Sequence, residues 1–121
     1  MEALQDKQLL NYYINKYDIA KVFQKDMSEY LFLHLFDKGN LIFRANDKID
    51  RLYFMVEGKA KVYSLLKNGK SLLLRFYNPL MVIGDVEFMD GSPATCNVEV
   101  INKAVCIGIS LENLQNYAIN D

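Results

Sequence analysis

The sequence is poor in the residues that most often perform catalysis or bind metals. Its 121 residues include one histidine, two cysteines and no tryptophan. With one histidine and no Cys-x-x-Cys pair, a structural zinc site lacks ligands. Four-cysteine iron–sulfur ligation within one chain is excluded, although two copies could together supply four thiols. Nucleophile elbows, phosphate-binding loops and dinucleotide fingerprints are also absent. The sequence therefore predicts a protein that is not an enzyme and needs no cofactor.

An excess of one charge and long apolar runs are absent as well. The chain has 14 lysines and arginines against 15 acidic residues, so its net charge gives no electrostatic footprint for nucleic acid. No segment approaches the roughly 20 apolar residues of a membrane span, and the N-terminus lacks the pattern of a secretory signal. We therefore expect a cytoplasmic protein without membrane contacts, in which Cys96 and Cys106 are reduced and buried on strands.

The sequence has enough apolar material for one core. Hydrophobic residues make up 51% of the chain, with 8 Tyr and 7 Phe and only two prolines. A chain of this length forms a single domain that buries roughly two thirds of its unfolded surface. Disorder is excluded by this composition.

Helical patterns lie at both ends of the chain. An apolar stripe with helical spacing consists of Leu10, Tyr13, Ile14 and Tyr17. Asp18 permits a second short turn, and the helical lead-in is expected over about residues 1–29. Ser110 is a suitable N-cap for a C-terminal helix that starts within residues 110–121.

Between about residues 30 and 109 the pattern is β. Turn signals separate short β segments about every 8 to 12 residues, which is typical of an all-β sandwich or barrel. These signals are at residues 37–40, 44–50, 57–58, 68–69, 78–79, 90–93 and 102–103.

Two hairpins are expected within this region. Asn68-Gly69 predicts a type I′ turn that joins residues 59–66 to 70–77. A second hairpin joins residues 95–100 to 104–109 and keeps Cys96 away from Cys106. Gly58 is expected at a bend or bulge.

Few polar residues are candidates for chemistry. His34 lies in an apolar run and is expected to be a packed or half-exposed strand residue. Asp85 and Glu87 are close in sequence, but nothing near them completes a mechanism. The segment from Ile83 to Cys96 either holds backbone N–H groups around an anion or is a helical connector packed on the sheet.

The order of these segments resembles a known family. The segments concerned are residues 52–62, 68–70, 83–85 and 94–95, followed by Val98 and Val100. Together they resemble the cyclic-nucleotide-binding domain of the Crp/Fnr superfamily of bacterial transcription regulators, with the greatest likeness to YeiL-like regulators. The resemblance extends over about residues 33–117. It implies a mainly β fold with flanking helices: a double-stranded β-helix, or jelly roll.

The resemblance also implies a ligand pocket. Members that bind cAMP use a Gly-Glu pair for the ribose, then an arginine and a hydroxyl residue for the phosphate. Gly84 and Thr95 match this pattern, Asp85 replaces the glutamate with a side chain one methylene shorter, and Ala94 replaces the arginine. Loss of a charged hydrogen bond costs about 1.5 to 3 kcal/mol. The resemblance therefore implies an effector that is not cAMP, or no effector.

Arg75 bears on this pocket. By alignment on Asn78 and Gly84, it falls where relatives have a small polar residue that lines the cavity. Its guanidinium either supplies the missing positive charge from the opposite wall or points to solvent from the face of the sheet.

The resemblance predicts an effector-sensing domain of a transcription regulator. Family members continue into a dimerisation helix and a helix-turn-helix domain, whereas this chain is expected to contact DNA only through a domain that it does not contain. An alternative is a stand-alone interaction module that uses exposed Tyr and Phe. A cupin-like metalloenzyme is disfavoured because His34 is alone. The sequence leaves open whether the protein is a homodimer.

Overall fold

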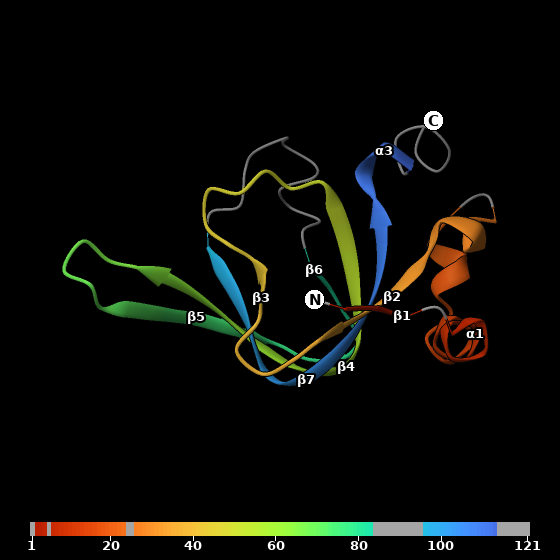
Figure 1. The fold of residues 1–121 in the computed structure, drawn as a ribbon, viewed down its shortest axis with the longest axis horizontal. Helices are drawn as coiled ribbons and strands as arrows, with labels where there is room; N and C mark the ends of the chain where they lie inside the picture. The colour runs from red at the N-terminus through yellow and green to blue at the C-terminus, as the bar shows by residue number, and fades with distance from the viewer. Residues whose placement is uncertain (1, 5, 24–25, 84–95, 114–121) are drawn as a thin grey trace.

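The structure is a computed structural model that describes residues 2–4, 6–23, 26–83 and 96–113. Its strands form one antiparallel sheet in the order β1-β2-β7-β4-β5, with β3 paired to β7 and β6 paired to β4. Figure 1 shows that β4 and β7 bend strongly, so the sheet curls into a roll. The predicted mainly β jelly roll with flanking helices is confirmed.

The elements have the following bounds. The strands are β1 (Glu2–Leu4), β2 (Phe32–Phe36), β3 (Leu41–Phe43), β4 (Arg51–Leu65), β5 (Ser71–Tyr77), β6 (Met81–Ile83) and β7 (Asn97–Ser110). The α-helices are α1 (Lys7–Lys16) and α3 (Leu111–Asn113), and the 3₁₀ helices are η1 (Ile19–Val22) and η2 (Ser28–Tyr30). Within the described residues, no helix has the length and hydropathy to cross a membrane.

The N-terminal helix forms where the apolar stripe predicts it. Asp6 caps α1 by accepting a hydrogen bond from the Leu9 backbone N–H at 3.0 Å. Tyr13 and Ile14 are buried against the sheet, and η1 follows as the expected second turn. The lead-in also contains a strand that the sequence pattern does not predict. This strand, β1, pairs antiparallel with β2.

The C-terminal helix begins at the predicted cap. Ser110 Oγ accepts a hydrogen bond from the Asn113 backbone N–H at 3.1 Å. The residues expected to continue this helix lie outside those described.

The longest pairing in the sheet joins β4 and β7. It extends from Arg51 opposite Ser110 to Tyr63 opposite Asn97. The predicted hairpin over residues 95–109 is therefore wrong, since β7 continues through Asn102 and Lys103. Register shifts between the two strands, opposite Met55 to Ala60 of β4, absorb the irregularity at this point, so β7 does not have to turn.

Because β7 is one continuous strand, the separation of the two cysteines does not come from their register in a hairpin. Cys96 and Cys106 are not joined by a disulfide. Cys106 is on β7 and Cys96 directly precedes this strand, so the two are ten residues apart along a chain that does not fold back in a hairpin. Burial raises the pKa of Cys106 to about 12, so this thiol stays protonated at neutral pH.

The hairpin of β4 and β5 is confirmed, but its turn differs from the prediction. Only Gly69, and not Asn68, has a positive φ, at 83°. Gly69 N–H donates to Leu66 O at 3.0 Å, and Leu66 N–H donates to Lys70 O at 2.8 Å. The turn is thus a three-residue loop with glycine at the left-handed position. The Asn68 side chain favours this arrangement by accepting from the Lys70 N–H at 3.0 Å.

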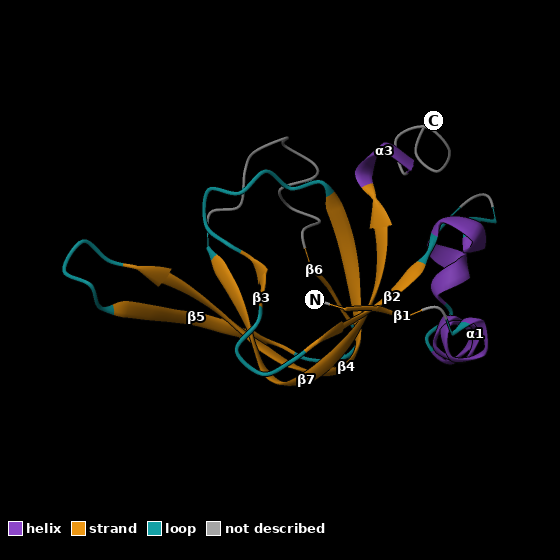
Figure 2. Ribbon diagram, viewed as in Figure 1, coloured by secondary structure: helices purple, strands orange, loops and turns teal. Residues whose placement is uncertain are grey.

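Two groups of buried side chains pack on the two sides of the sheet, and Figure 2 shows α1 beside the strands. The interior cluster, inside the roll, consists of Phe36, Ile42, Phe43, Ile49, Tyr53, Met55, Ala60, Val62, Tyr77, Ile83, Val98, Val100, Ala104 and Cys106. The second cluster packs under α1 and includes Leu33, Phe54, Val56, Ile107 and Ile109. Alternation along β4 separates the two, since Tyr53 and Met55 face the interior while Phe54 and Val56 face the helix side.

Gly58 provides the bulge that lets β4 bend against β7. Its φ is +96°, and an added Cβ would lie 2.5 Å from the Lys103 carbonyl oxygen. We predict that Gly58→Ala lowers the free energy of unfolding by about 3 kcal/mol or more, because backbone strain and a backbone clash add. Gly69→Ala is the matched control: its φ is +83° with nothing within 4 Å, so it should cost only about 1 kcal/mol. Urea unfolding measures both, and equal losses would contradict a tight bulge.

Candidate functional site

Of the four pocket residues predicted from the sequence, the structure describes Arg75. Gly84, Asp85 and Thr95 lie outside the described residues, and so does Ala94. The predicted anion-binding segment therefore stays a prediction. The described part of the candidate site consists of the strands that precede and follow this segment in the sequence.

Arg75 lies on the inner face of the sheet. In the β4–β5 ladder it is directly opposite Val62, and residues directly opposite each other place their side chains on the same face. Val62 is buried in the interior cluster. Tyr77, two residues further along β5, is opposite Ala60 and belongs to the same cluster. Arg75 is thus on the side of the sheet that lines the roll.

The Arg75 guanidinium is held by its neighbour Tyr77. Its Nη2 donates to the Tyr77 hydroxyl at 2.8 Å, and its Cζ lies 5.1 Å from the Tyr77 ring centroid. Arg75 is also exposed. The two interpretations left open by the sequence are therefore not exclusive, because the side chain is on the inner face and still in contact with solvent.

This arrangement leaves the positive charge of Arg75 available. In the described part of the chain, no carboxylate forms an ion pair with Arg75. A guanidinium has five N–H donors, and Tyr77 uses one of them. The remaining donors can bind a carboxylate or phosphate with two parallel hydrogen bonds.

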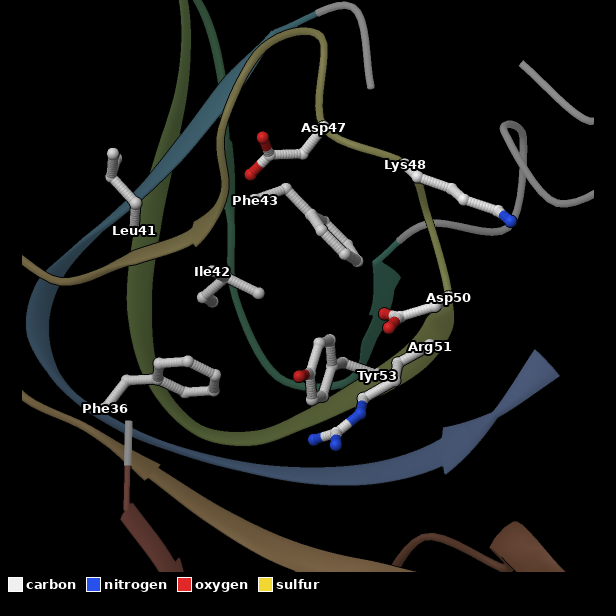
Figure 3. A pocket seen from close by; sticks show the side chains of 9 residues that line it. All are labelled: Phe36, Leu41, Ile42, Phe43, Asp47, Lys48, Asp50, Arg51 and Tyr53. Carbon is white, nitrogen blue, oxygen red and sulfur yellow. The ribbon is translucent and has the colours of Figure 1, made fainter. Parts of the chain in front are cut away.

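A second feature of the inner face is a cavity of about 420 Å³. It is lined by Phe36 from β2, Leu41, Ile42 and Phe43 from β3, Asp47, Lys48 and Asp50 from the following loop, and Arg51 and Tyr53 from β4. In Figure 3 the Phe43 ring lies between Asp47 of the loop and the Tyr53 ring, and the Lys48 ammonium points away from these rings. The ring centroid of Tyr53 is 5.7 Å from those of both Phe36 and Phe43.

The loop that walls this cavity is tied to the start of β7. The Asn97 side chain is buried, and its Oδ1 accepts a hydrogen bond from the Ala45 backbone N–H at 2.8 Å. Buried side-chain amides usually have such a partner because an unpaired polar atom is costly away from water.

Below the cavity, two buried titratable side chains pack together. The rings of His34 and Tyr53 meet edge to face at 5.4 Å. Burial raises the pKa of Tyr53, while a hydrogen bond from Arg51 and its charge act in the opposite direction. Burial also lowers the pKa of His34, and the charge of Arg51 adds to this effect. His34 is thus a packed strand residue, as the sequence predicts.

The cavity is the part of the site that sequence reasoning missed. Residues 44–50 carry only a turn signal, and the three aromatic rings come from three successive strands. Their proximity depends on pairing of β3 and β4 with β7, for which no local pattern exists. Within the described ranges no three His, Cys, Asp or Glu side chains are grouped to hold a metal ion.

The fold and the inner face fit one family. Residues 33–121 match the family described as cyclic nucleotide-binding domain. The chain belongs to this family. The match extends over most of the β-roll and agrees with the resemblance found in the sequence.

Curated relatives of this cyclic nucleotide-binding domain are named as regulators. A CRP-like cAMP-activated global transcriptional regulator of Mycobacterium tuberculosis is 24% identical over 82 residues, covering 68% of this chain and 37% of the relative. The regulatory protein YeiL of Escherichia coli O157:H7 is 26% identical over 70 residues, covering 58% of this chain and 32% of the relative. The chain thus spans about a third of the length of these relatives.

Solved structures share the fold of this cyclic nucleotide-binding domain. The sensor domain of the transcriptional regulator DNR from Pseudomonas aeruginosa has a TM-score of 0.75 at 14% identity, covering 93% of this chain and 79% of that chain. The regulatory subunit of a cAMP-independent protein kinase A from Trypanosoma brucei has a TM-score of 0.78 at 14% identity, covering 92% of this chain and 42% of that chain. The domain is therefore similar to sensor domains of Crp/Fnr-like regulators.

The lowered pKa of His34 predicts a pH dependence of stability. The unfolded state, with a histidine pKa near 6.5, binds a proton that the folded state resists. The free energy of unfolding should therefore fall as pH decreases from about 6.5 towards the lower folded pKa. In His34→Gln this component should be missing. Urea unfolding of both proteins between about pH 5 and 7.5 gives the difference, in which the shared carboxylates cancel. Parallel pH curves for the two proteins would contradict the assignment.

Proposed function

We propose that this chain is the effector-sensing domain of a Crp/Fnr-like transcription regulator, and that its effector is an anion other than cAMP or is absent. The family match and the regulators among its relatives support the sensing role. Contacts to DNA belong to a separate domain of the regulator, which acts in the cytoplasm, and the sensor itself is not an enzyme.

The position of Arg75 is the observation that supports an anionic effector. The place where cAMP-binding members have arginine holds Ala94 here. Arg75 offers a guanidinium from β5, on the inner face and without a carboxylate partner among the described residues. An anion bound by Arg75 is held from β5, on the inner face of the sheet. Because Asp85 is also shorter than glutamate, the ribose and phosphate of cAMP lose their matched contacts together.

A second candidate function is a protein-interaction module. The observation in its favour is the set of exposed large hydrophobic side chains, most of which lie in the β4–β5 hairpin. This surface is compatible with a sensor domain and is considered separately below.

A titration with matched variants tests the proposed effector class. Parent protein, Arg75→Ala and the surface control Lys38→Ala are heated with cAMP, cGMP, a linear nucleotide, short fatty acids or benzoate. An anion at 100 times its dissociation constant should stabilise the parent and the control by about 2.7 kcal/mol. Arg75→Ala should lose most of this stabilisation, and cAMP should give the smallest shift.

Two outcomes would count against an anionic effector that differs from cAMP. Tight cAMP binding that is independent of Arg75 would overturn the assignment of a different effector. If no anion stabilises the parent, Arg75 has no ligand-binding role and the roll acts as a scaffold without effector.

A further inference from the structure

The β4–β5 hairpin exposes more apolar side chain than any other part of the described chain. Its exposed residues are Leu65 (65%), Leu66 (44%), Leu72 (49%), Leu73 (50%), Leu74 (49%) and Phe76 (40%). In Figure 1 the hairpin projects from the side of the roll, away from α1. Apolar side chains gathered on a projecting element usually mark a site of interaction.

Register assigns most of these residues to the outer face of the hairpin. Val62 and Ala60 face the interior cluster, so Lys61, Tyr63 and Leu65, which alternate with that face along β4, face outward. The outer cross-strand pairs are Lys61 with Phe76, Tyr63 with Leu73 and Leu65 with Ser71. Alternation from Phe76 also places Leu74 on this face. This outer patch, consisting of Tyr63, Leu65, Leu73, Leu74 and Phe76, is separate from the inner face that carries Arg75.

Positive charges border the outer patch. Lys59 Nζ lies 4.5 Å from the Phe76 ring centroid, and Lys61 Nζ lies 5.5 Å from that of Tyr63. Lys67 and Lys70 are exposed in the turn at the tip. The carboxylate of Glu99 on β7 also lies at this border, 3.9 Å from Lys61 Nζ.

Charge is strongly segregated between the hairpin and the rest of the chain. Residues 59–77 contain five of the 14 basic residues and none of the 15 acidic ones. The rest of the chain therefore contains nine basic and fifteen acidic residues. The nearly neutral chain thus consists of a basic, apolar hairpin on an acidic body.

We propose that the outer patch docks a partner protein whose contact surface combines apolar side chains with surrounding carboxylates. The leucines and Phe76 supply the apolar centre of such an interface, and the lysines supply its charged rim. Complementary charge at the rim speeds association and orients the partner.

Other occupants fit this surface less well. Symmetric pairing of two hairpins would bring together two segments that each carry five positive charges and no negative ones. Addition of a strand along β5 is disfavoured because the register shift near Leu74 interrupts that edge. A lipid bilayer would have to accept the polar tip of Lys67, Asn68 and Lys70 before it reached the leucines. Leucines add nothing to binding of nucleic acid phosphates.

Designed peptides test this proposal on the chain as it is. The probe is a fluorescent amphipathic helical peptide of about 18 residues with a leucine face and a glutamate face. Its controls replace every glutamate by lysine or every leucine by serine. Fluorescence anisotropy should show binding of the Leu/Glu peptide and at least about tenfold weaker binding of both controls.

Matched variants locate the binding surface. Leu73→Ser with Leu74→Ser should weaken binding of the Leu/Glu peptide about tenfold, and Lys67→Glu with Lys70→Glu should weaken it and reduce its salt dependence. The controls are Phe32→Ser, which changes an exposed aromatic on β2, and Lys7→Glu with Lys38→Glu, which makes the same change in charge outside the hairpin. Both controls should bind like the parent. Thermal unfolding verifies that each variant is folded, and amide chemical shifts of the parent should change in residues 59–77.

Several results would overturn the proposal. These are failure of the Leu/Glu peptide to bind, equal binding of the Leu/Lys peptide, and equal loss of affinity in the control variants. Stronger binding to phosphatidylglycerol vesicles or to duplex DNA than to the peptide would also overturn it. So would a concentration-dependent dimer that is abolished by Leu73→Ser with Leu74→Ser. None of these readouts involves the effector, so failure here leaves the test of Arg75 unaffected.

Discussion

Antiparallel pairing of β4 with β7 is the interaction on which the rest of the domain depends. These two strands are paired with each other along most of their length, and β2, β3, β5 and β6 are attached to one or the other. The pair can bend because its register shifts lie around Gly58, where the backbone of β7 passes too close for any side chain. The bend creates an inside and an outside. Alternation along β4 then assigns one set of residues to the interior cluster and the other to the cluster under α1.

Local signals were sufficient where the structure itself is local. The stripe of α1, the Ser110 cap and the β4–β5 hairpin involve residues close in sequence, and their patterns were readable. The errors arose where a distant partner decides. Asn102-Lys103 has the composition of a turn, but pairing of β7 with β4 keeps this segment extended. At Asn68-Gly69 the predicted position of the turn is correct. Its type differs, because the loop also includes Lys67 and so has three residues instead of two.

The candidate site divides in the same way. Spacing and resemblance drew attention to Arg75 and to the missing arginine at position 94. They could not assign Arg75 to a face, because that assignment depends on its register against Val62. The cavity beside Tyr53 required three strands to meet and had no signal in the sequence. The total charge of the chain was equally uninformative about its surface, since it averages a basic hairpin with an acidic body.

The hydrogen bond from Ala45 N–H to the Asn97 side chain has a mechanical consequence. It joins the wall of the cavity to the first residue of β7. Because Asn97 is buried, water cannot readily replace Ala45 as its partner. A displacement at the start of β7 would therefore pull on the 44–50 loop, and through this loop on the wall of the cavity that Tyr53 also lines.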